Sequence, residues 1–153
     1  MKIKEIMIRD VISLKPDDRG QEALDLLFKS KISGLPVIDE GGKLLGMFTE
    51  KSVLSYILPS YVEKVGRFIY QDNPKAISRK LTELKVVKVS QLMRREVITT
   101  SEEASLTEAA RLMLTQKVRR LLVVDKEKKV LGIVARCDIL KAIPKEAEMS
   151  STS

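Results

Sequence analysis

The chain contains two copies of one sequence pattern, because residues 2–54 align with residues 88–140 at a constant offset of 86 positions without a gap. A repeat of this size cannot bury its apolar face alone, so it buries that face against its neighbour. The duplication therefore predicts one pseudo-twofold body made of two copies. The best-matched runs are residues 7–12 with 93–98, residues 35–39 with 121–125, and residues 44–48 with 130–134.

The residue types that are missing narrow the possible chemistry. The chain has no His and one Cys, Cys137. It therefore lacks the commonest general base and metal ligand, and it cannot form a thiolate zinc cluster or an internal disulfide. It also lacks a Walker-type phosphate loop and a repeated pair of carboxylates. We expect a protein that is not an enzyme and has neither a metal site nor a catalytic cofactor.

The start of the chain and its hydropathy predict where the protein resides. Charged residues occur at Lys2, Lys4 and Glu5, where a signal peptide needs an apolar run. No apolar stretch approaches the roughly 18 residues of a membrane span. These features predict a cytoplasmic protein that makes no membrane contact, and the single Cys is consistent with a reducing compartment.

The net charge of +7 is concentrated in the second half of the chain. Residues 88–140 carry eleven basic and seven acidic side chains, whereas residues 2–54 carry nine of each. Such an excess can serve nucleic acid, an acidic partner or a small anionic ligand, or it can simply be solvated surface. Nucleic acid is disfavoured because no helix-turn-helix, zinc finger or interleaved aromatic stripe is present.

Each copy has the pattern of a strand, a helix, two strands and a closing helix. A short β-rich segment at residues 10–14 or 96–100 leads each copy. Ser105 and Glu108 have the spacing of a capping box, which predicts that a helix begins there. The apolar runs at 35–38 and 44–48, and their counterparts at 121–124 and 130–134, predict strands joined by tight turns. Closing helices begin near Thr49 and Ala135. The expected fold class is α/β (α+β), a β-α-β-β-α unit repeated in tandem and packed as a pseudo-twofold pair.

The segment between the copies is not repeated and predicts a helical insertion. Its residues 75–84 have helical periodicity. The expected domains are repeat 1 at 1–58, the helical linker at 59–87, repeat 2 at 88–144 and a disordered tail at 145–153. The insertion either packs on its own body or forms an interface with a second subunit. The whole unrepeated stretch, residues 55–87, holds four of the chain's aromatic residues, Tyr56, Tyr61, Phe68 and Tyr70.

The two copies resemble a tandem pair of cystathionine-beta-synthase (CBS) domains. The resemblance rests on a Leu-x-Val-aliphatic-Asp strand followed by a Leu-Gly-apolar-apolar strand that enters a helix, at residues 35–49 and again at 121–135. It implies a pair of sheets packed together around two clefts, where such pairs often bind adenosine-containing ligands. The family's signature for this ligand is Ser or Thr followed three residues later by Asp.

Each copy holds half of that signature. The first copy keeps the hydroxyl at Thr49 but has Ser52 where the acid is expected, and the second has Ala135 but keeps Asp138. A carboxylate can accept hydrogen bonds from both ribose hydroxyls, and charge-assisted hydrogen bonds are about twice as strong as neutral ones. The second copy also gathers cations that suit phosphate, including Lys117, whereas the first has Lys31 and Ser33 nearby. We therefore expect two unequal clefts.

The resemblance and the chemistry together define the candidate site residues. The main ligand-binding residues are Asp138, Arg136, Ala135, Arg119, Arg120, Leu121, Thr99, Thr100, Val97 and Ile98. The second, weaker cleft is expected at Thr49, Ser52, Lys51, Gly34, Leu35, Pro36, Val11 and Ser13. No residue is expected to be catalytic or to bind metal.

The sequence therefore predicts a non-catalytic, regulatory protein that senses an adenine nucleotide (AMP, ADP or ATP) in the inter-repeat cleft, with energy sensing as its role. One alternative ligand is S-adenosylmethionine or an NAD-type adenosyl compound. An alternative function is that of a protein-interaction or dimerisation module that binds no nucleotide. A homodimer is expected, and a regulated protein partner is possible, although nothing in the sequence identifies it.

Overall fold

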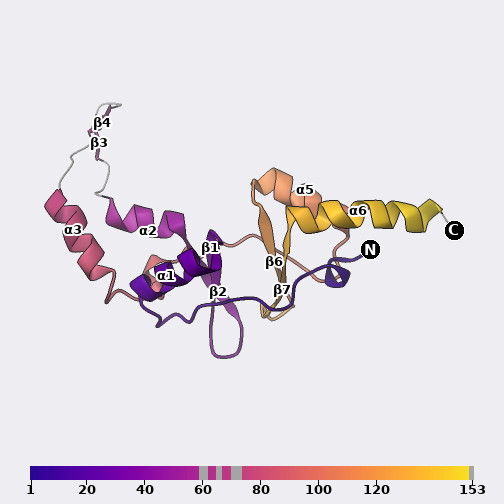
Figure 1. Cartoon of the computed structure of the whole chain (residues 1–153), viewed down its shortest axis with the longest axis horizontal. Helices are drawn as coiled ribbons and strands as arrows, with labels where there is room; N and C mark the ends of the chain where they lie inside the picture. The colour runs from indigo at the N-terminus through magenta and orange to yellow at the C-terminus, as the bar shows by residue number, and fades with distance from the viewer. Residues whose placement is uncertain (59–61, 65–66, 70–73, 152–153) are drawn as a thin grey trace. The chain divides into compact units, whose positions relative to one another are not determined.

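The structure is a computed structural model that describes residues 1–58, 62–64, 67–69 and 74–151 (Figure 1). The mixed helix and sheet architecture confirms the expected fold class. The elements are η1 (Ile3–Glu5), α1 (Gly20–Ser30), β1 (Gly34–Ile38), β2 (Leu44–Thr49), α2 (Glu50–Ile57), β3 (Val62–Lys64), β4 (Arg67–Ile69), α3 (Pro74–Glu83), α4 (Val89–Leu92), β5 (Thr99–Thr100), α5 (Leu106–Gln116), β6 (Arg120–Val124), β7 (Val130–Ala135) and α6 (Arg136–Ser151).

The compact units of the structure exchange their leading segments. Unit 1 contains Met1–Ile12, Glu40–Leu44 and Val97–Ser153, and unit 2 contains Ser13–Asp39 and Leu45–Glu96. The start of the first repeat therefore packs with the body of the second, and residues 88–96, which start the second repeat, pack with the body of the first. Each unit is described separately below.

Unit 1 is built on a three-stranded sheet in the order β5-β6-β7. β5 runs parallel to β6, with Thr99 opposite Leu122, and β6 runs antiparallel to β7, with Arg120 opposite Ala135. Helices α5 and α6 lie beside each other and contact these strands (Figure 1). Ser105 accepts a hydrogen bond from the Glu108 amide at 3.1 Å, which confirms the predicted cap of α5.

The leading segment of unit 1 is bound by backbone hydrogen bonds and by close packing. The Ile3 amide donates to the Ala104 carbonyl at 2.9 Å, and Ile8 pairs with Ile133 on β7. Ile3 is fully buried in the core of this unit. Gly132 on β7 lies directly under the segment, because a Cβ built there would be 2.9 Å from both the Ile8 carbonyl oxygen and the Met7 sulfur.

Unit 2 repeats these contacts at positions shifted by 86 residues. The Val89 amide donates to the Asp18 carbonyl at 2.8 Å, and Arg94 pairs with Met47 on β2. A Cβ on Gly46 would be 2.6 Å from the Arg94 carbonyl oxygen and 2.9 Å from the Met93 sulfur. The Gly of the Leu-Gly strand motif therefore has the same function in both units. Because it has no side chain, the leading segment of the other repeat can approach the strand closely.

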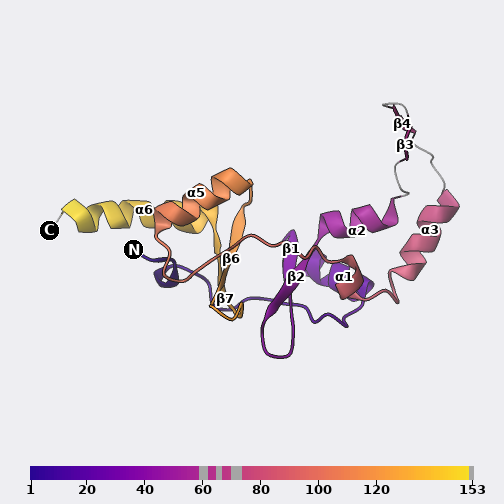
Figure 2. The same cartoon turned by 180° about the vertical axis from the view of Figure 1, so that it is seen from behind.

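Helix α3 of the linker packs on α2 within unit 2 (Figure 2). The Tyr56 hydroxyl on α2 donates to Glu83 Oε2 on α3 at 2.8 Å, and this bond lowers the pKa of Glu83. Lys80 Nζ lies 4.5 Å from the centre of the Tyr56 ring. This part of the insertion packs on its own body. Tyr61 and Tyr70 fall outside the described residues, and the description does not extend to the side chain of Phe68.

Two local predictions were wrong. In the first copy only Leu14 of the predicted strand 10–14 pairs, in a parallel bridge with Val37, because the chain passes from unit 1 to unit 2 between residues 12 and 13. Residues 145–151, expected in a disordered tail, belong to α6, which continues past Pro144 to Ser151. The residues after Pro144 include Ala and Glu, which are good helix formers. The short helices η1 and α4 were not predicted.

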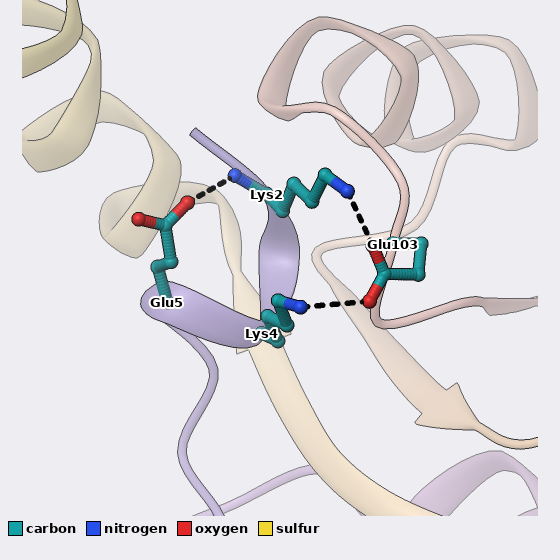
Figure 3. A network of polar contacts seen from close by, with 4 residues as sticks. All are labelled: Lys2, Lys4, Glu5 and Glu103. Atoms are coloured by element: carbon teal, nitrogen blue, oxygen red, sulfur yellow. Dashed lines mark hydrogen bonds and ion pairs between the residues drawn. The ribbon is translucent and has the colours of Figure 1, made fainter.

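A charged cluster fastens the leading segment to unit 1 (Figure 3). The Glu103 carboxylate accepts from Lys2 Nζ at 2.5 Å and from Lys4 Nζ at 2.8 Å, while Glu5 accepts from the Lys2 amide. The two lysine hydrogen bonds lower the pKa of Glu103 from 4.5 to about 2. In unit 2 the equivalent pair, Lys88 with Asp17, is 3.3 Å apart.

Replacing Gly46 with Ala should destabilise the protein by about 1–3 kcal/mol, the usual cost of forcing an extra methyl into a packed contact. The new Cβ has to displace backbone at Arg94, which cannot swing away as a side chain would. Gly34→Ala is the control, because its nearest neighbours are side-chain methyls of Thr49 and Met47 at 3.1 and 3.3 Å. Urea denaturation measures the free energy of unfolding of both variants. Equal losses of this free energy in the two variants would contradict the close approach at Gly46.

Glu103→Gln should reduce the stability of the protein at neutral pH but not in strong acid. Because the pKa of Glu103 is lowered in the folded state, its stabilising effect is present above about pH 4.5 and is lost as the pH falls toward 2. Denaturation of wild type and variant across this pH range measures the difference in their stability. Added salt should reduce this difference, because the charged groups are exposed. Glu96→Gln is the control and should show no such pH dependence, because Glu96 is exposed and forms no ion pair among the described residues.

Candidate functional site

The candidate residues of the second repeat gather at one end of the unit 1 sheet. β5 and β6 are parallel and β7 is antiparallel to β6, so the start of β5, the start of β6 and the end of β7 lie together, while Thr99 and Thr100 pair further along β6 with Leu122 and Val123. The Arg136 amide donates to the Arg119 carbonyl at 3.1 Å, which ties the start of α6 to the start of β6. The structure thus brings together the backbone of the ten main residues predicted for the ligand.

Asp138 is half-buried in the first turn of α6 and has one carboxylate oxygen in use. Its Oδ2 accepts the Ala135 amide at 2.8 Å, as the third residue of a helix does in a capping box. Its Oδ1 has only the Cys137 sulfur nearby, at 4.0 Å, which is a weak contact. Asp138 therefore caps the helix and keeps one oxygen able to accept from a ligand hydroxyl.

The cations at this end of the sheet are exposed, and no acidic partner for them occurs among the residues that the structure describes. Arg119, Arg120, Arg136 and Lys117 are all exposed. Across the part of the chain that the structure describes, none of them forms an ion pair. Unpaired guanidinium groups beside a carboxylate acceptor could bind a group that carries both hydroxyls and negative charge.

The apolar candidates of unit 1 differ in how much surface they offer. Leu121 is completely buried in the core, so neither its side chain nor its backbone is exposed to a ligand. Val97, Ile98, Thr99 and Thr100 are half-buried, and Ile98 packs against the edge of the core. The half-buried residues 97–100 are therefore the ones that offer contact surface.

In unit 2, Thr49 and Ser52 cap α2 reciprocally. The Ser52 amide donates to Thr49 Oγ1 at 3.1 Å, the Thr49 amide donates to Ser52 Oγ at 3.2 Å, and the two hydroxyl oxygens are 3.0 Å apart. Gly34 and Ser13 are half-buried, whereas Leu35 and Pro36 are buried. Of the two remaining residues predicted for the weaker cleft, Lys51 is exposed on α2 and Val11 belongs to unit 1.

A pocket of about 220 Å³ adjoins this cap within unit 2. Three predicted residues line it, and three others were missed by the sequence reasoning: Ser55, Leu92 and Arg94. Leu92 and Arg94 come from the leading segment of the second repeat, and no pattern in the sequence links that segment to the first repeat's helix. The lining residues are Thr49, Lys51, Ser52, Ser55, Leu92 and Arg94.

A second hollow of about 220 Å³ lies in unit 1 between α5 and α6 and has a purely apolar surface. Arg136 lines it beside Leu114 and Leu140, which are 72% and 68% exposed. One predicted ligand residue therefore also borders an apolar groove. The other lining residues are Ala110, Met113, Ile139 and Ile143.

The described residues contain no group of three acidic, His or Cys side chains that could hold a metal ion. Among these same residues, no helix has the length and apolar character needed to cross a membrane.

Comparison with known families identifies the class of the protein. The family model described as CBS domain matches residues 3–59 and residues 89–145, which together make up more than half of the 153 residues. The chain belongs to the CBS domain family and carries two of these domains in tandem. The resemblance seen in the strand motifs is therefore confirmed.

One relative is a much larger protein, and only part of it aligns with this chain. The inosine-5'-monophosphate dehydrogenase of Methanocaldococcus jannaschii is 34% identical over 140 residues, which are 92% of this chain and 23% of the dehydrogenase. The chain thus spans 23% of that relative's length, and the rest of the dehydrogenase lies outside the aligned region.

Two solved CBS-pair structures have the same fold over nearly their whole length. Arabidopsis thaliana CBSX2 in complex with AMP matches with a TM-score of 0.71 and 26% identity, covering 95% of this chain and 98% of that one. The CBS domain pair of MJ0100 in complex with 5'-methylthioadenosine and S-adenosyl-L-methionine has a TM-score of 0.64 and 25% identity, with coverage of 95% and 98%. The neighbours are ligand-binding CBS pairs, and their ligands share an adenosyl group.

Proposed function

We propose that this protein is a non-catalytic regulatory module that binds an adenine nucleotide, AMP, ADP or ATP, chiefly through the end of the unit 1 sheet that carries Asp138. Its role would be to sense the level of that nucleotide in the cytoplasm and to pass the signal to a protein partner. The repeats at 1–58 and 88–144, joined by the linker 59–87 and followed by residues 145–153, supply two unequal ligand sites in this proposal.

The observation that carries the proposal is Asp138 Oδ1, which has only a weak contact at 4.0 Å, at the end of the sheet that also carries arginines with no ion pair among the described residues. Asp138 Oδ1 is available to accept from the hydroxyls of a ribose, and Arg119 and Arg120 are available to bind phosphate oxygens in pairs. Half-buried Val97 and Ile98 supply an apolar surface for a base. The ligands of CBSX2 and of MJ0100, AMP and S-adenosyl compounds, support an adenosyl ligand.

S-adenosylmethionine is the competing ligand, since it shares the ribose and base but carries a cation in place of phosphate. An NAD-type compound is a third adenosyl ligand to be tested. The cluster of cations at Arg119, Arg120 and Arg136 favours a phosphate-bearing ligand, because a cationic sulfonium would be repelled by it.

Surface hydrophobicity favours a homodimer as the functional form. Leu114 and Leu140 of unit 1 are 72% and 68% exposed, and their counterparts in unit 2, Phe28 and Leu54, are 64% and 56% exposed. The repeat thus presents the same apolar pair twice, once on each pair of neighbouring helices. Large exposed apolar side chains that cluster in this way are typical of association surfaces. If no adenosyl ligand binds, this dimerisation surface would be the protein's main functional feature.

Asp138→Ala should weaken binding of the nucleotide by about tenfold or more, because hydrogen bonds to a charged group contribute about 1.5–3 kcal/mol. Calorimetric titration with AMP, ADP, ATP, S-adenosylmethionine and NAD identifies the ligand on the wild type and then measures the loss. Asp138→Ala also removes a helix cap, so Ser105→Ala, which removes the cap of α5, is the matched control. Both variants should lose about 1 kcal/mol of stability, and only the first should lose affinity. Unchanged affinity in Asp138→Ala would show that the site is wrongly placed.

Leu140→Lys should convert the proposed dimer into a monomer, since it places a charge in the apolar surface that the second copy would cover. Sedimentation equilibrium should give twice the mass of the 17.2 kDa chain for the wild type and the mass of one chain for the variant. Val86→Lys is the control, because Val86 is also 68% exposed but does not line the groove. A monomeric wild type, or a dimer that both variants leave intact, would contradict the proposed interface.

A further inference from the structure

Helix α3 and the turn after it lie between the two matches to the CBS domain model. The first match ends at residue 59 and the second begins at residue 89, whereas α3 spans Pro74–Glu83. Helical hydrogen bonding continues into the turn, since the Leu84 amide donates to the Lys80 carbonyl at 3.0 Å and the Val87 amide donates to the Glu83 carbonyl at 2.9 Å. The surface of this segment is therefore a feature of this chain that the repeat does not supply.

The face of α3 that packs on α2 neutralises its own charges. Glu83 is the only acidic residue of the helix. Its Oε2 accepts the Tyr56 hydroxyl of α2 at 2.8 Å and lies 3.5 Å from Lys80 Nζ. Lys80 in turn lies over the Tyr56 ring, with Nζ 4.5 Å from the ring centre. The helix therefore uses its one carboxylate, together with Lys80, in the contact with α2.

The opposite, exposed face of the segment carries four cations. Lys75 and Arg79 lie one helical turn apart, and Lys85 follows in the turn after the helix. Arg19 joins them, because its Nη1 donates to the Val86 carbonyl of this turn at 2.7 Å. All four side chains are exposed, and none forms an ion pair within the described ranges. We call these four residues the cationic surface of unit 2.

Two exposed apolar side chains lie among these cations. Leu81 and Val86 are 45% and 68% exposed. Residues three or four apart share a helix face, so Leu81 lies beside Lys85, and Val86 lies beside Thr82 in line with Arg79. A peptide can pair with the cations and also cover the apolar side chains, whereas a phosphate backbone can only pair with the cations. The mixed surface therefore favours a protein segment over a nucleic acid.

A second copy of this chain fits the cationic surface poorly. The chain has a net charge of +7, so two copies repel each other wherever their basic surfaces meet. The exposed apolar pairs assigned above to self-association lie on α1, α2, α5 and α6, and none of them is on α3. The charge of the surface is instead complementary to a different protein that carries acidic residues.

From these observations we infer that the cationic surface of unit 2 is a docking site for an acidic segment of a partner protein. Carboxylates of that segment pair with Arg19, Lys75, Arg79 and Lys85, and its apolar side chains cover Leu81 and Val86. The inference rests on the proposed function only for the regulatory role of this partner. Docking itself uses residues of unit 2 and does not require the Asp138 site.

Fluorescence anisotropy with the whole chain and a short labelled peptide of repeated Glu-Leu-Glu tests this inference. The wild type should bind this peptide more tightly than the matching Gln-Leu-Gln peptide, and added salt should weaken the binding. Arg79→Glu should weaken it by about fivefold or more, because it removes one ion pair and repels the peptide. Arg79→Gln, which adds no carboxylate near Glu83, should weaken it by about two- to fivefold. Arg111→Glu is the matched control, since it makes the same charge change at an exposed arginine of α5.

Two further measurements separate this surface from the alternatives. Asp138→Ala should bind the acidic peptide as the wild type does in the absence of nucleotide, so a failure of the proposed nucleotide site does not affect this result. Labelled single-stranded DNA that binds through Arg79 more tightly than the peptide would overturn the inference in favour of nucleic acid. The inference is also overturned if the wild type binds neither peptide or both equally, or if Arg79→Glu and Arg111→Glu weaken binding equally.

Discussion

Each unit depends on one contact, in which the leading segment of the other repeat packs closely against a glycine of a strand. Met7 and the Ile8 backbone lie against Gly132, and Met93 and the Arg94 backbone lie against Gly46. A side chain at either glycine would keep the segment away from the strand. The segment carries a buried apolar residue into the core, Ile3 in unit 1 and Val89 in unit 2, so the glycine contact and the core form together. Charges at Glu103 and Asp17 then fasten the same segments from outside.

Periodicity in the sequence was enough to predict the regular elements of each repeat. The strands at 34–38 and 120–124, the strands that follow them, helices α1, α2, α3 and α5 and the start of α6 lie where the sequence pattern placed them. The exchange of leading segments could not be predicted in the same way, because periodicity reports which face of an element is buried and not which copy buries it. Residues 10–13 illustrate this limit. Their β-rich composition predicted a strand, but they lie where the chain leaves one unit for the other.

The candidate site was predictable where its residues are close in sequence and on one element. Thr49 and Ser52 line a pocket, and Asp138 follows the end of β7 at the same end of the sheet as Arg120, the first residue of β6. Leu121 shows the limit of a family pattern, because it matches the pattern but is buried completely in the core. Arg94 was missed for a different reason. It lies more than forty residues from Thr49 along the chain, and its aligned counterpart Ile8 is apolar, so neither proximity nor repetition pointed to it.

The exchanged segments also determine what a shortened version of this chain would contain. A fragment that stops before residue 88 would keep β2 and its Gly46 but lose Val89 and Met93, which close that unit. A fragment that begins at residue 88 would have the opposite defect, with Gly132 exposed and the place of Ile3 empty. Cutting at the boundary between the repeats thus leaves two incomplete cores. The smallest piece of this sequence with a complete core is the pair, because each core needs segments from both copies of the repeat.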